Sequence, residues 1–116
     1  MLGTMPRFAL EPADAAFFST APHVFTYQKH FAAPPDKVWE SLVSDESLAA
    51  WGPSVTKVEW LTPRPFGVGT SREVTLAPGL VRVHETFFRW EEGRRYSFTV
   101  DHANIPSLRR FAEDYL

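Results

Sequence analysis

Apolar and polar side chains alternate along residues 70–102, and this alternation restricts the fold more than any other feature of the chain. Three runs, TSREVTL, LVRVHETFFRW and RRYSFTVDH, have the two-residue period of half-buried β-strands. The runs are separated by Ala-Pro-Gly and Glu-Glu-Gly, which are typical of short turns. We therefore expect a meander of antiparallel strands in the second half of the chain.

The turn positions determine which residues of this meander face each other. A first turn centred on 78–79 pairs Arg72 with Glu85, and a second centred on 92–93 pairs Glu85 with Val100. A slip of one residue would bury the polar face, so the register is firmly specified. Both turns place the same ten residues on one face, which are Arg72, Val74, Leu76, Val81, Val83, Glu85, Phe87, Tyr96, Phe98 and Val100.

Glu85 is the unusual member of this apolar face. Arg72 lies directly across the ladder, and an Arg–carboxylate pair can be bidentate and charge-assisted. One interpretation is a structural ion pair, which is common where carboxylates are perturbed. The other is a polar anchor in an apolar pocket, which would bind a ligand oxygen or transfer a proton.

The first half of the chain combines short elements of both kinds. Residues 1–22 form a proline-punctuated lead-in with one possible helical turn at Asp14-Ala-Ala-Phe-Phe, and residues 23–32 alternate like a strand. Helical spacing predicts two short helices in tandem, one in APPDKVWESLV and one in SDESLAAW. SVTKVEWL follows as a strand, and a last strand begins near Arg110. These elements predict an α+β fold.

Composition limits the range of functions. A chain of 116 residues forms one domain at most. A net charge of −2 gives no reason to expect a nucleic acid or an anionic membrane as partner. There is no Cys, no secretory signal pattern and no run near the roughly 18 apolar residues of a membrane span. We therefore expect a cytoplasmic protein without membrane insertion.

Other motifs give weaker signals. His84-Glu85 is not a zinc-helix motif because its segment is a strand, and Gly67-Val-Gly69 leads into a strand rather than a helix. His23, His30 and His102 likewise lack ligand spacing, so we expect no metal and no cofactor. Aromatic residues make up 15% of the chain, and they either fill a core or line a cavity.

Three segments in order resemble the polyketide cyclase/dehydrase-type members of the SRPBCC (START-like) superfamily. They are APPDKVWESLVSDESLAAWGP, FGVGTSREV and VHETFFRWEEGRRYSFTV, and the resemblance covers residues 23–116. It implies a helix-grip fold, in which a curved antiparallel sheet with two short helices after the first strand wraps a long C-terminal helix. A hydrophobic cavity on the concave face would then bind a lipid, a polyketide or an aromatic compound.

The resemblance also implies where ligand contacts lie. We expect a binding module for a hydrophobic small molecule; the alternatives are a cyclase/dehydratase with Glu85 as acid or base, and an interaction domain that regulates chaperones. The expected ligand-binding residues are Trp51, Trp60, Phe66, Arg72, Val74, Val83, Glu85, Phe87, Phe98 and Val100.

One departure from the family affects the cavity. The chain ends at Glu-Asp-Tyr-Leu, where the family usually continues through another strand and the long helix. An aromatic face without that cover would be unusually large for a soluble monomer. Three explanations are open: the chain is a fragment, the lead-in 1–22 folds over the face, or a homodimer covers it.

Overall fold

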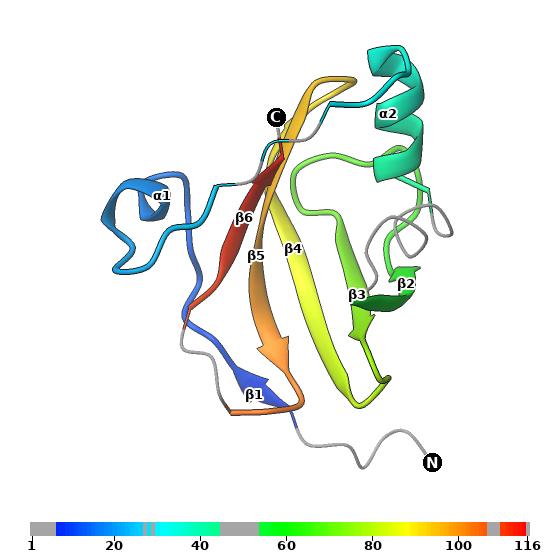
Figure 1. The fold of residues 1–116 in the computed structure, drawn as a ribbon. Helices are drawn as coiled ribbons and strands as arrows, with labels where there is room; N and C mark the ends of the chain where they lie inside the picture. The colour runs from blue at the N-terminus through cyan, green and yellow to red at the C-terminus, as the bar shows by residue number, and fades with distance from the viewer. Residues whose placement is uncertain (1–6, 27, 29, 45–53, 107–109, 116) are drawn as a thin grey trace.

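A computed structural model describes residues 7–26, 28, 30–44, 54–106 and 110–115, and the structural statements below refer to these residues. The described elements are β1 (Phe8–Ala9), α1 (Phe17–Thr20), α2 (Pro35–Leu42), β2 (Val55–Trp60), β3 (Ser71–Leu76), β4 (Val81–Glu91), β5 (Arg95–Ala103) and β6 (Ala112–Tyr115). The strands form one curved, open antiparallel sheet, and the two short helices lie at its periphery (Figure 1). The fold is therefore α+β, as expected.

Two short strands share one edge of the sheet. The strands run β1-β5-β4-β3-β2, and β6 also pairs with β5. One edge of β5 is thus shared: β1 occupies its C-terminal end and β6 its N-terminal end. Figure 1 shows β1 and β6 on the same side of β5, one toward each end. The last predicted strand, from about Arg110, is confirmed as β6.

The predicted hairpin register is confirmed at its central pairs. Arg72 pairs with Glu85 between β3 and β4, and Glu85 pairs with Val100 between β4 and β5. The turns use glycine where the backbone requires it, because Gly79 and Gly93 have φ values of 108° and 77°. Residues that have a side chain rarely adopt such backbone angles, so glycine at these two positions favours the turn conformations.

A bulge in β4 modifies the regular alternation. Pairing shifts between Phe87, which faces Phe98, and Arg89, which faces Ser97. The extra residue is Phe88, and beyond it Trp90 pairs with Tyr96. A β-bulge redirects side chains because two residues on one strand oppose one on its partner. Trp90 therefore joins the apolar face, which simple alternation from Phe87 does not predict.

The first predicted helix is confirmed as α2. Pro35 occupies its first position, and Asp36 lies in its first turn, where the helix dipole favours a carboxylate. Trp39 is its buried residue; the indole packs edge-on against Trp90 and donates a hydrogen bond from Nε1 to Glu92 Oε1 at 3.1 Å. These contacts hold α2 beside the β4–β5 turn. Most of the second predicted helix, SDESLAAW, lies outside the described residues.

The predicted strand at 23–32 is wrong for the residues that can be described. Residues 23–26, 28 and 30 are neither strand nor helix, and Phe25 is 90% exposed. A strand needs a partner for its backbone groups, whatever its side-chain period. In the described structure the edge of β5 is filled by β1 and β6. The strand that precedes the helices is instead β1, within the lead-in.

The lead-in packs against the polar face of the sheet, which is opposite the apolar face that carries Arg72 and Glu85. The Ala13 amide donates to Thr99 Oγ1 at 3.0 Å, and the Phe18 ring lies 6.0 Å from that of Phe88. The helical turn expected near Phe17 is present as α1. The lead-in therefore covers little of the apolar face. Leu10 is its one described residue in the buried apolar cluster.

The apolar face is buried in the described structure. Phe87, Phe98 and Val100 are at most 2% exposed. Aromatic rings pack on one another there, with Tyr96 at 4.9 Å from Phe87 and Tyr115 at 6.1 Å from Phe98 between ring centres. The sheet and its aromatic core are thus defined, whereas the helix-grip arrangement remains a prediction. Neither of the two helices in the described part of the chain has the length and hydrophobicity of a membrane span.

Candidate ligand-binding site

The Arg72–Glu85 pair is the polar centre of the apolar face. Arg72 Nε donates to Glu85 Oε1 at 2.6 Å, and the two side chains are 2% and 7% exposed. The contact follows directly from their pairing across the β3–β4 ladder. Such a charge-assisted bond in a nearly dry interior fixes the position of both groups.

Aromatic rings surround the guanidinium of Arg72. Its central carbon lies 5.1 Å from the Trp60 ring and 5.0 Å from each of the rings of Phe87 and Phe98. Tyr96 adds a fourth ring at 5.6 Å. Planar guanidinium groups interact favourably with aromatic faces, and more so when water is excluded. The pair is therefore embedded in an aromatic shell rather than at the rim of the sheet.

Burial changes the acidity of Glu85. Loss of hydration raises the pKa of this carboxyl to about 7, and the charge and hydrogen bond of Arg72 offset only part of that effect. A carboxyl group with such a pKa changes protonation near neutral pH. It can therefore act either as a hydrogen-bond donor or as an acceptor toward a third group.

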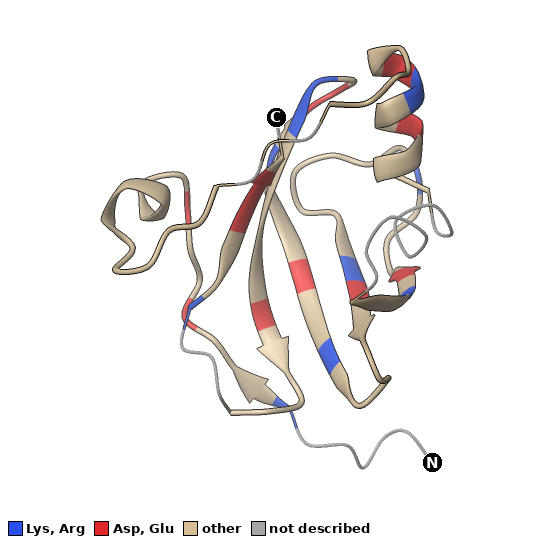
Figure 2. Cartoon of the chain, viewed as in Figure 1, with Lys and Arg blue, Asp and Glu red and all other residues tan. Residues whose placement is uncertain are grey.

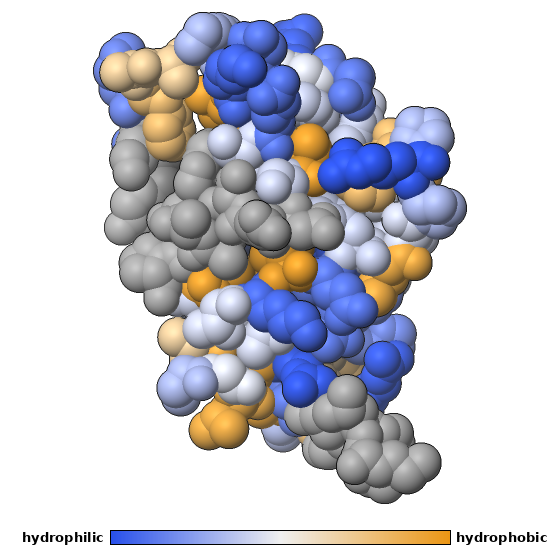
Figure 3. Space-filling model, turned by 90° about the vertical axis from the view of Figure 1, so that its right-hand side faces the viewer, coloured by the Kyte–Doolittle hydropathy of each residue, from blue (hydrophilic) through white to orange (hydrophobic). Residues whose placement is uncertain are grey.

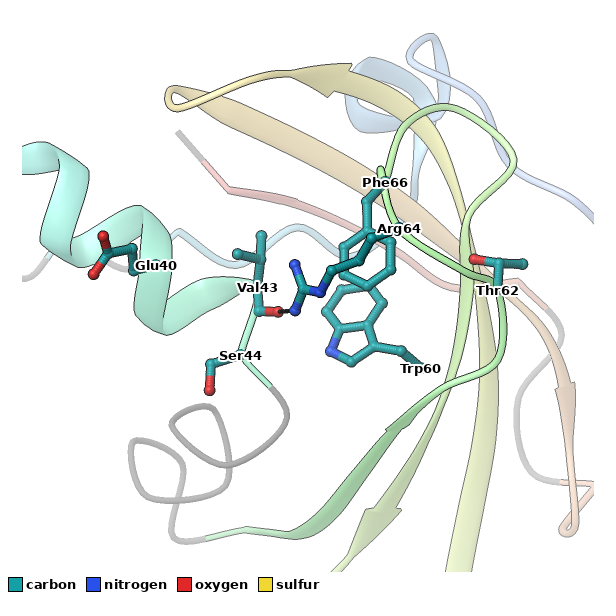
Figure 4. A pocket seen from close by; sticks show the side chains of 7 residues that line it. All are labelled: Glu40, Val43, Ser44, Trp60, Thr62, Arg64 and Phe66. Atoms are coloured by element: carbon teal, nitrogen blue, oxygen red, sulfur yellow. Dashed lines mark hydrogen bonds between the residues drawn. The ribbon is translucent and has the colours of Figure 1, made fainter.

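An open pocket of about 550 Å³ lies beside this shell, between the end of α2 and the loop that joins β2 to β3. In Figure 4 the Phe66 ring lies against the Trp60 indole, and Arg64 reaches toward Val43. The Trp60 and Phe66 ring centres are 4.3 Å apart, and Arg64 Nη2 donates to the Val43 carbonyl at 3.0 Å. Figure 3 shows small hydrophobic patches among hydrophilic residues on this side of the molecule.

Two buried hydrogen-bond donors near the pocket lack acceptors. Neither Trp60 Nε1 nor Arg72 Nη1 has a hydrogen-bond partner in the described part of the chain. Trp60 lines the pocket, and the guanidinium carbon of Arg72 lies over its ring at 5.1 Å. Buried polar groups are almost always paired, so two neighbouring unpaired donors call for an explanation. Each is able to donate to an oxygen acceptor.

The predicted site residues fall into two groups. Trp60 and Phe66 line the pocket, and Trp51 lies outside the described residues. The remaining seven are buried around the ion pair, away from the pocket lining; they are Arg72, Val74, Val83, Glu85, Phe87, Phe98 and Val100. Trp60 and Arg72, paired across β2 and β3, connect the two groups.

Sequence reasoning missed five of the pocket-lining residues, which are Glu40, Val43, Ser44, Thr62 and Arg64. Glu40 lies in α2, Val43 and Ser44 follow its end, and Thr62 and Arg64 lie in the loop TPRPFGVG, which has no periodic pattern. The available signal was the loop itself, because two prolines and two glycines directly after a strand favour an irregular, exposed segment.

The described helices and strands carry charged residues of both signs. In Figure 2 acidic and basic residues both occur along α2 and the strands. A stripe of one charge is the usual footprint of a nucleic-acid-binding surface. Within the described residues, no single helix or strand in Figure 2 carries such a stripe.

Comparison with known proteins places this arrangement in a family. The family model described as polyketide cyclase/dehydrase and lipid transport matches residues 22–115. The chain belongs to this family. The match covers the strands β2 to β6 and helix α2, so it includes both the ion pair and the pocket. The resemblance inferred from the sequence motifs is thereby confirmed.

The similar curated proteins are mycobacterial. Proteins of Mycobacterium tuberculosis and Mycobacterium bovis, both described as uncharacterized, are 33% identical over 108 residues. The alignment covers 93% of this chain and 64% of each relative, so the chain spans less than two thirds of their length. No solved structure matches the chain significantly.

Proposed function

We propose that this chain binds a hydrophobic small molecule that carries at least one oxygen acceptor. The apolar part of the molecule would lie against Trp60 and Phe66 in the open pocket, and its oxygen would accept from Trp60 Nε1. Family membership supports a hydrophobic ligand, since the family is described by polyketide cyclases, dehydrases and lipid transport. The observation that carries the proposal is the buried, unpaired indole N–H at the pocket wall.

The physical argument concerns the free energy of these donors. A buried donor without an acceptor costs about 1–3 kcal/mol relative to a paired one. A ligand oxygen at Trp60 would recover that free energy and orient the ligand, whereas contact with the two rings would supply non-directional affinity. The guanidinium of Arg72 lies over the same ring, so its positive charge favours a carbonyl or carboxylate oxygen over a donor group.

The proposal is tested with two pairs of probes that differ in the acceptor. 2-Naphthoic acid and dodecanoic acid carry the oxygen, whereas naphthalene and 1-aminododecane do not carry an acceptor carboxylate. We expect the acids to raise the melting temperature and to bind in calorimetry more tightly than their counterparts, because only they can accept from the indole.

A variant separates the contribution of the indole N–H to binding from that of the aromatic ring. Trp60→Phe keeps an aromatic wall but removes the donor, so it should weaken both acids and leave the weak binding of naphthalene unchanged. Leu61→Phe is a matched control, because Leu61 is 46% exposed and does not line the pocket. Equal affinity of the acids for the wild type and Trp60→Phe would contradict the proposed contact, and absence of binding by every probe would contradict the proposed function.

A second candidate function is catalysis of the cyclase/dehydratase kind. It is favoured by one observation: the pKa of Glu85 lies at about 7 in a buried site, in the range that suits a general acid or base. Glu85→Gln keeps the shape and the hydrogen-bond acceptor but cannot transfer a proton. In a turnover assay with a polyketide-type substrate, loss of turnover with ligand affinity retained would support the enzyme, and unchanged turnover would exclude Glu85 as its acid or base.

A further inference from the structure

Three potential metal ligands meet on the face of the sheet opposite the ion pair. His84 Nδ1 lies 2.5 Å from Asp101 Oδ1, and His102 Nδ1 lies 3.9 Å from the same oxygen. Ligand atoms of the three residues all lie within 4.8 Å of one another. The two imidazole rings are 5.7 Å apart and nearly perpendicular. All three side chains are partly exposed, from 21% for His84 to 42% for His102.

A second β-bulge brings the three residues together. His84 pairs with His102, whereas the next residue, Glu85, pairs with Val100. Asp101 is therefore the extra residue on β5, and it shares a face with His102 instead of opposing it. Regular alternation would have placed these two neighbours on opposite faces of the sheet. Bulges that redirect side chains in this way are common next to functional sites.

Two further observations favour a ligand over a purely structural contact. His102 Nδ1 is buried yet has no hydrogen-bond partner in the residues that the structure describes. Thr86 Oγ1 donates to the second oxygen of Asp101 at 2.9 Å, which fixes the orientation of the carboxylate. Outer hydrogen bonds of this kind orient the ligands in protein metal sites. The cluster thus combines two imidazoles, one oriented carboxylate and one unused nitrogen.

We infer that His84, Asp101 and His102 bind a single divalent transition-metal ion, of the class of Zn²⁺, Co²⁺ or Ni²⁺. Two imidazoles and one carboxylate suit these ions and disfavour Ca²⁺ and Mg²⁺, which require mainly oxygen ligands. Metal–ligand bonds of about 2.0–2.2 Å would replace the present His84–Asp101 hydrogen bond after small side-chain rotations. Three protein ligands leave at least one position open for water or another ligand. The site is independent of the proposed pocket, which lies on the other face.

Metal binding can be measured directly with Zn²⁺ and Co²⁺. We expect calorimetry at pH 7.5 to give one equivalent of Zn²⁺ per chain, and Co²⁺ to give a visible absorption band that Zn²⁺ removes. The variants His84→Gln, Asp101→Asn and His102→Gln should each weaken Zn²⁺ binding by at least about tenfold, because each removes one of three ligands. Circular dichroism of each variant checks that the sheet is retained.

A matched control removes a histidine elsewhere. His23 is exposed and lies outside the sheet, so His23→Gln should leave Zn²⁺ affinity unchanged. Three outcomes would overturn the inference: absence of Zn²⁺ binding by the wild type, equal affinity of the wild type and the double variant His84→Gln/His102→Gln, or an equal loss in His23→Gln. The metal experiment and the hydrophobic-probe experiment are independent, because the two sites share no residues. A failure of one leaves the other valid.

Discussion

Arg72 and Glu85 form an ion pair of 2.6 Å across the β3–β4 ladder, inside an aromatic shell where both side chains are less than a tenth exposed. Because both charges are removed from water, each depends on the other. Removing one partner of a buried pair typically costs about 3–5 kcal/mol, whereas replacing both by apolar groups can be neutral or stabilising.

The first prediction is therefore strong coupling in a double-mutant cycle. Arg72→Leu and Glu85→Leu should each lower the free energy of unfolding by about 3 kcal/mol or more, and the double variant should recover most of that loss. Denaturation in urea measures the four stabilities. As a control, the exposed pair Arg94–Glu91, at 3.7 Å, should give a coupling below about 1 kcal/mol. Additive effects at Arg72 and Glu85 would contradict a coupled pair.

The second prediction concerns pH. The pKa of Glu85 is about 7 in the folded chain and near its ordinary value of 4.5 when unfolded, so the folded state binds more protons between these values. The free energy of unfolding should therefore fall as pH rises from about 4.5 to about 7, by at most about 1.4 kcal/mol per pH unit from this group.

A variant without this carboxyl isolates its contribution. Glu85→Gln should lose the decrease between pH 4.5 and 7. The lowered pKa of Asp114, caused first by its hydrogen bond from Arg95, acts in the opposite direction and at lower pH, where stability is lost as the carboxylate protonates. Thermal denaturation across the pH range measures both effects. An identical profile for the wild type and Glu85→Gln in the upper window would contradict the raised pKa.

A third prediction follows from the docking of α2 through Trp39. Its buried ring contacts Trp90 and Tyr96, and its indole N–H bonds to Glu92. Trp39→Ala should destabilise the fold by about 3–5 kcal/mol through the cavity that it leaves. Trp39→Phe should cost less, about 1–3 kcal/mol, because it keeps most of the ring contacts but not the hydrogen bond. Equal losses in chemical denaturation would show that the hydrogen bond, and not the packing, dominates.

A fourth prediction concerns the lead-in. Its α1 segment is held to the polar face partly by the contact between Phe18 and Phe88. Phe88→Ala should loosen this attachment and increase protease cleavage within residues 7–22, because locally released segments are cut faster. Phe25→Ala is the control, since Phe25 is 90% exposed and should not change the cleavage rate. Unchanged cleavage in Phe88→Ala would contradict the role of this contact.

A fifth prediction tests the β4–β5 turn. Gly93 has a φ of 77°, in the left-handed region that β-branched residues avoid. Gly93→Val should lower the free energy of unfolding by about 1–2 kcal/mol, whereas Gly93→Asn should cost less because Asn tolerates this conformation. Melting temperatures of the two variants provide the measurement. A larger loss for Asn than for Val would contradict the argument from backbone conformation.

Local pattern predicted the sheet well because its register is decided by two short turns. The pairing of Arg72 with Glu85, and the burial of both, followed from turn position and from the two-residue period. The family was likewise visible in the motifs around α2 and the hairpins, and the matched model confirms it. These are properties that nearby residues determine together.

What could not be predicted depends on contacts between distant segments or on irregular backbone. The alternation at 23–32 resembles a strand, but in the described residues no strand pairs with it, so the pattern alone was misleading. The bulges after Phe87 and His84 are not encoded by a turn or a proline, yet they move Trp90 to the core and bring Asp101 beside His102. With uninterrupted pairing, the histidines appear unrelated.

The shared edge of β5 has a consequence for how the chain reaches this structure. Phe8 pairs with Ala103 and Tyr96 pairs with Tyr115, so segments from both halves of the sequence meet on one strand. Of these pairings, that of Phe8 with Ala103 spans most of the chain and forms slowly because a large loop must close first, whereas Tyr96 and Tyr115 lie close together in the sequence. Until they form, β5 presents unpaired backbone groups beside a row of buried aromatic side chains. During synthesis and refolding, this part of β5 is therefore open to pairing with another molecule.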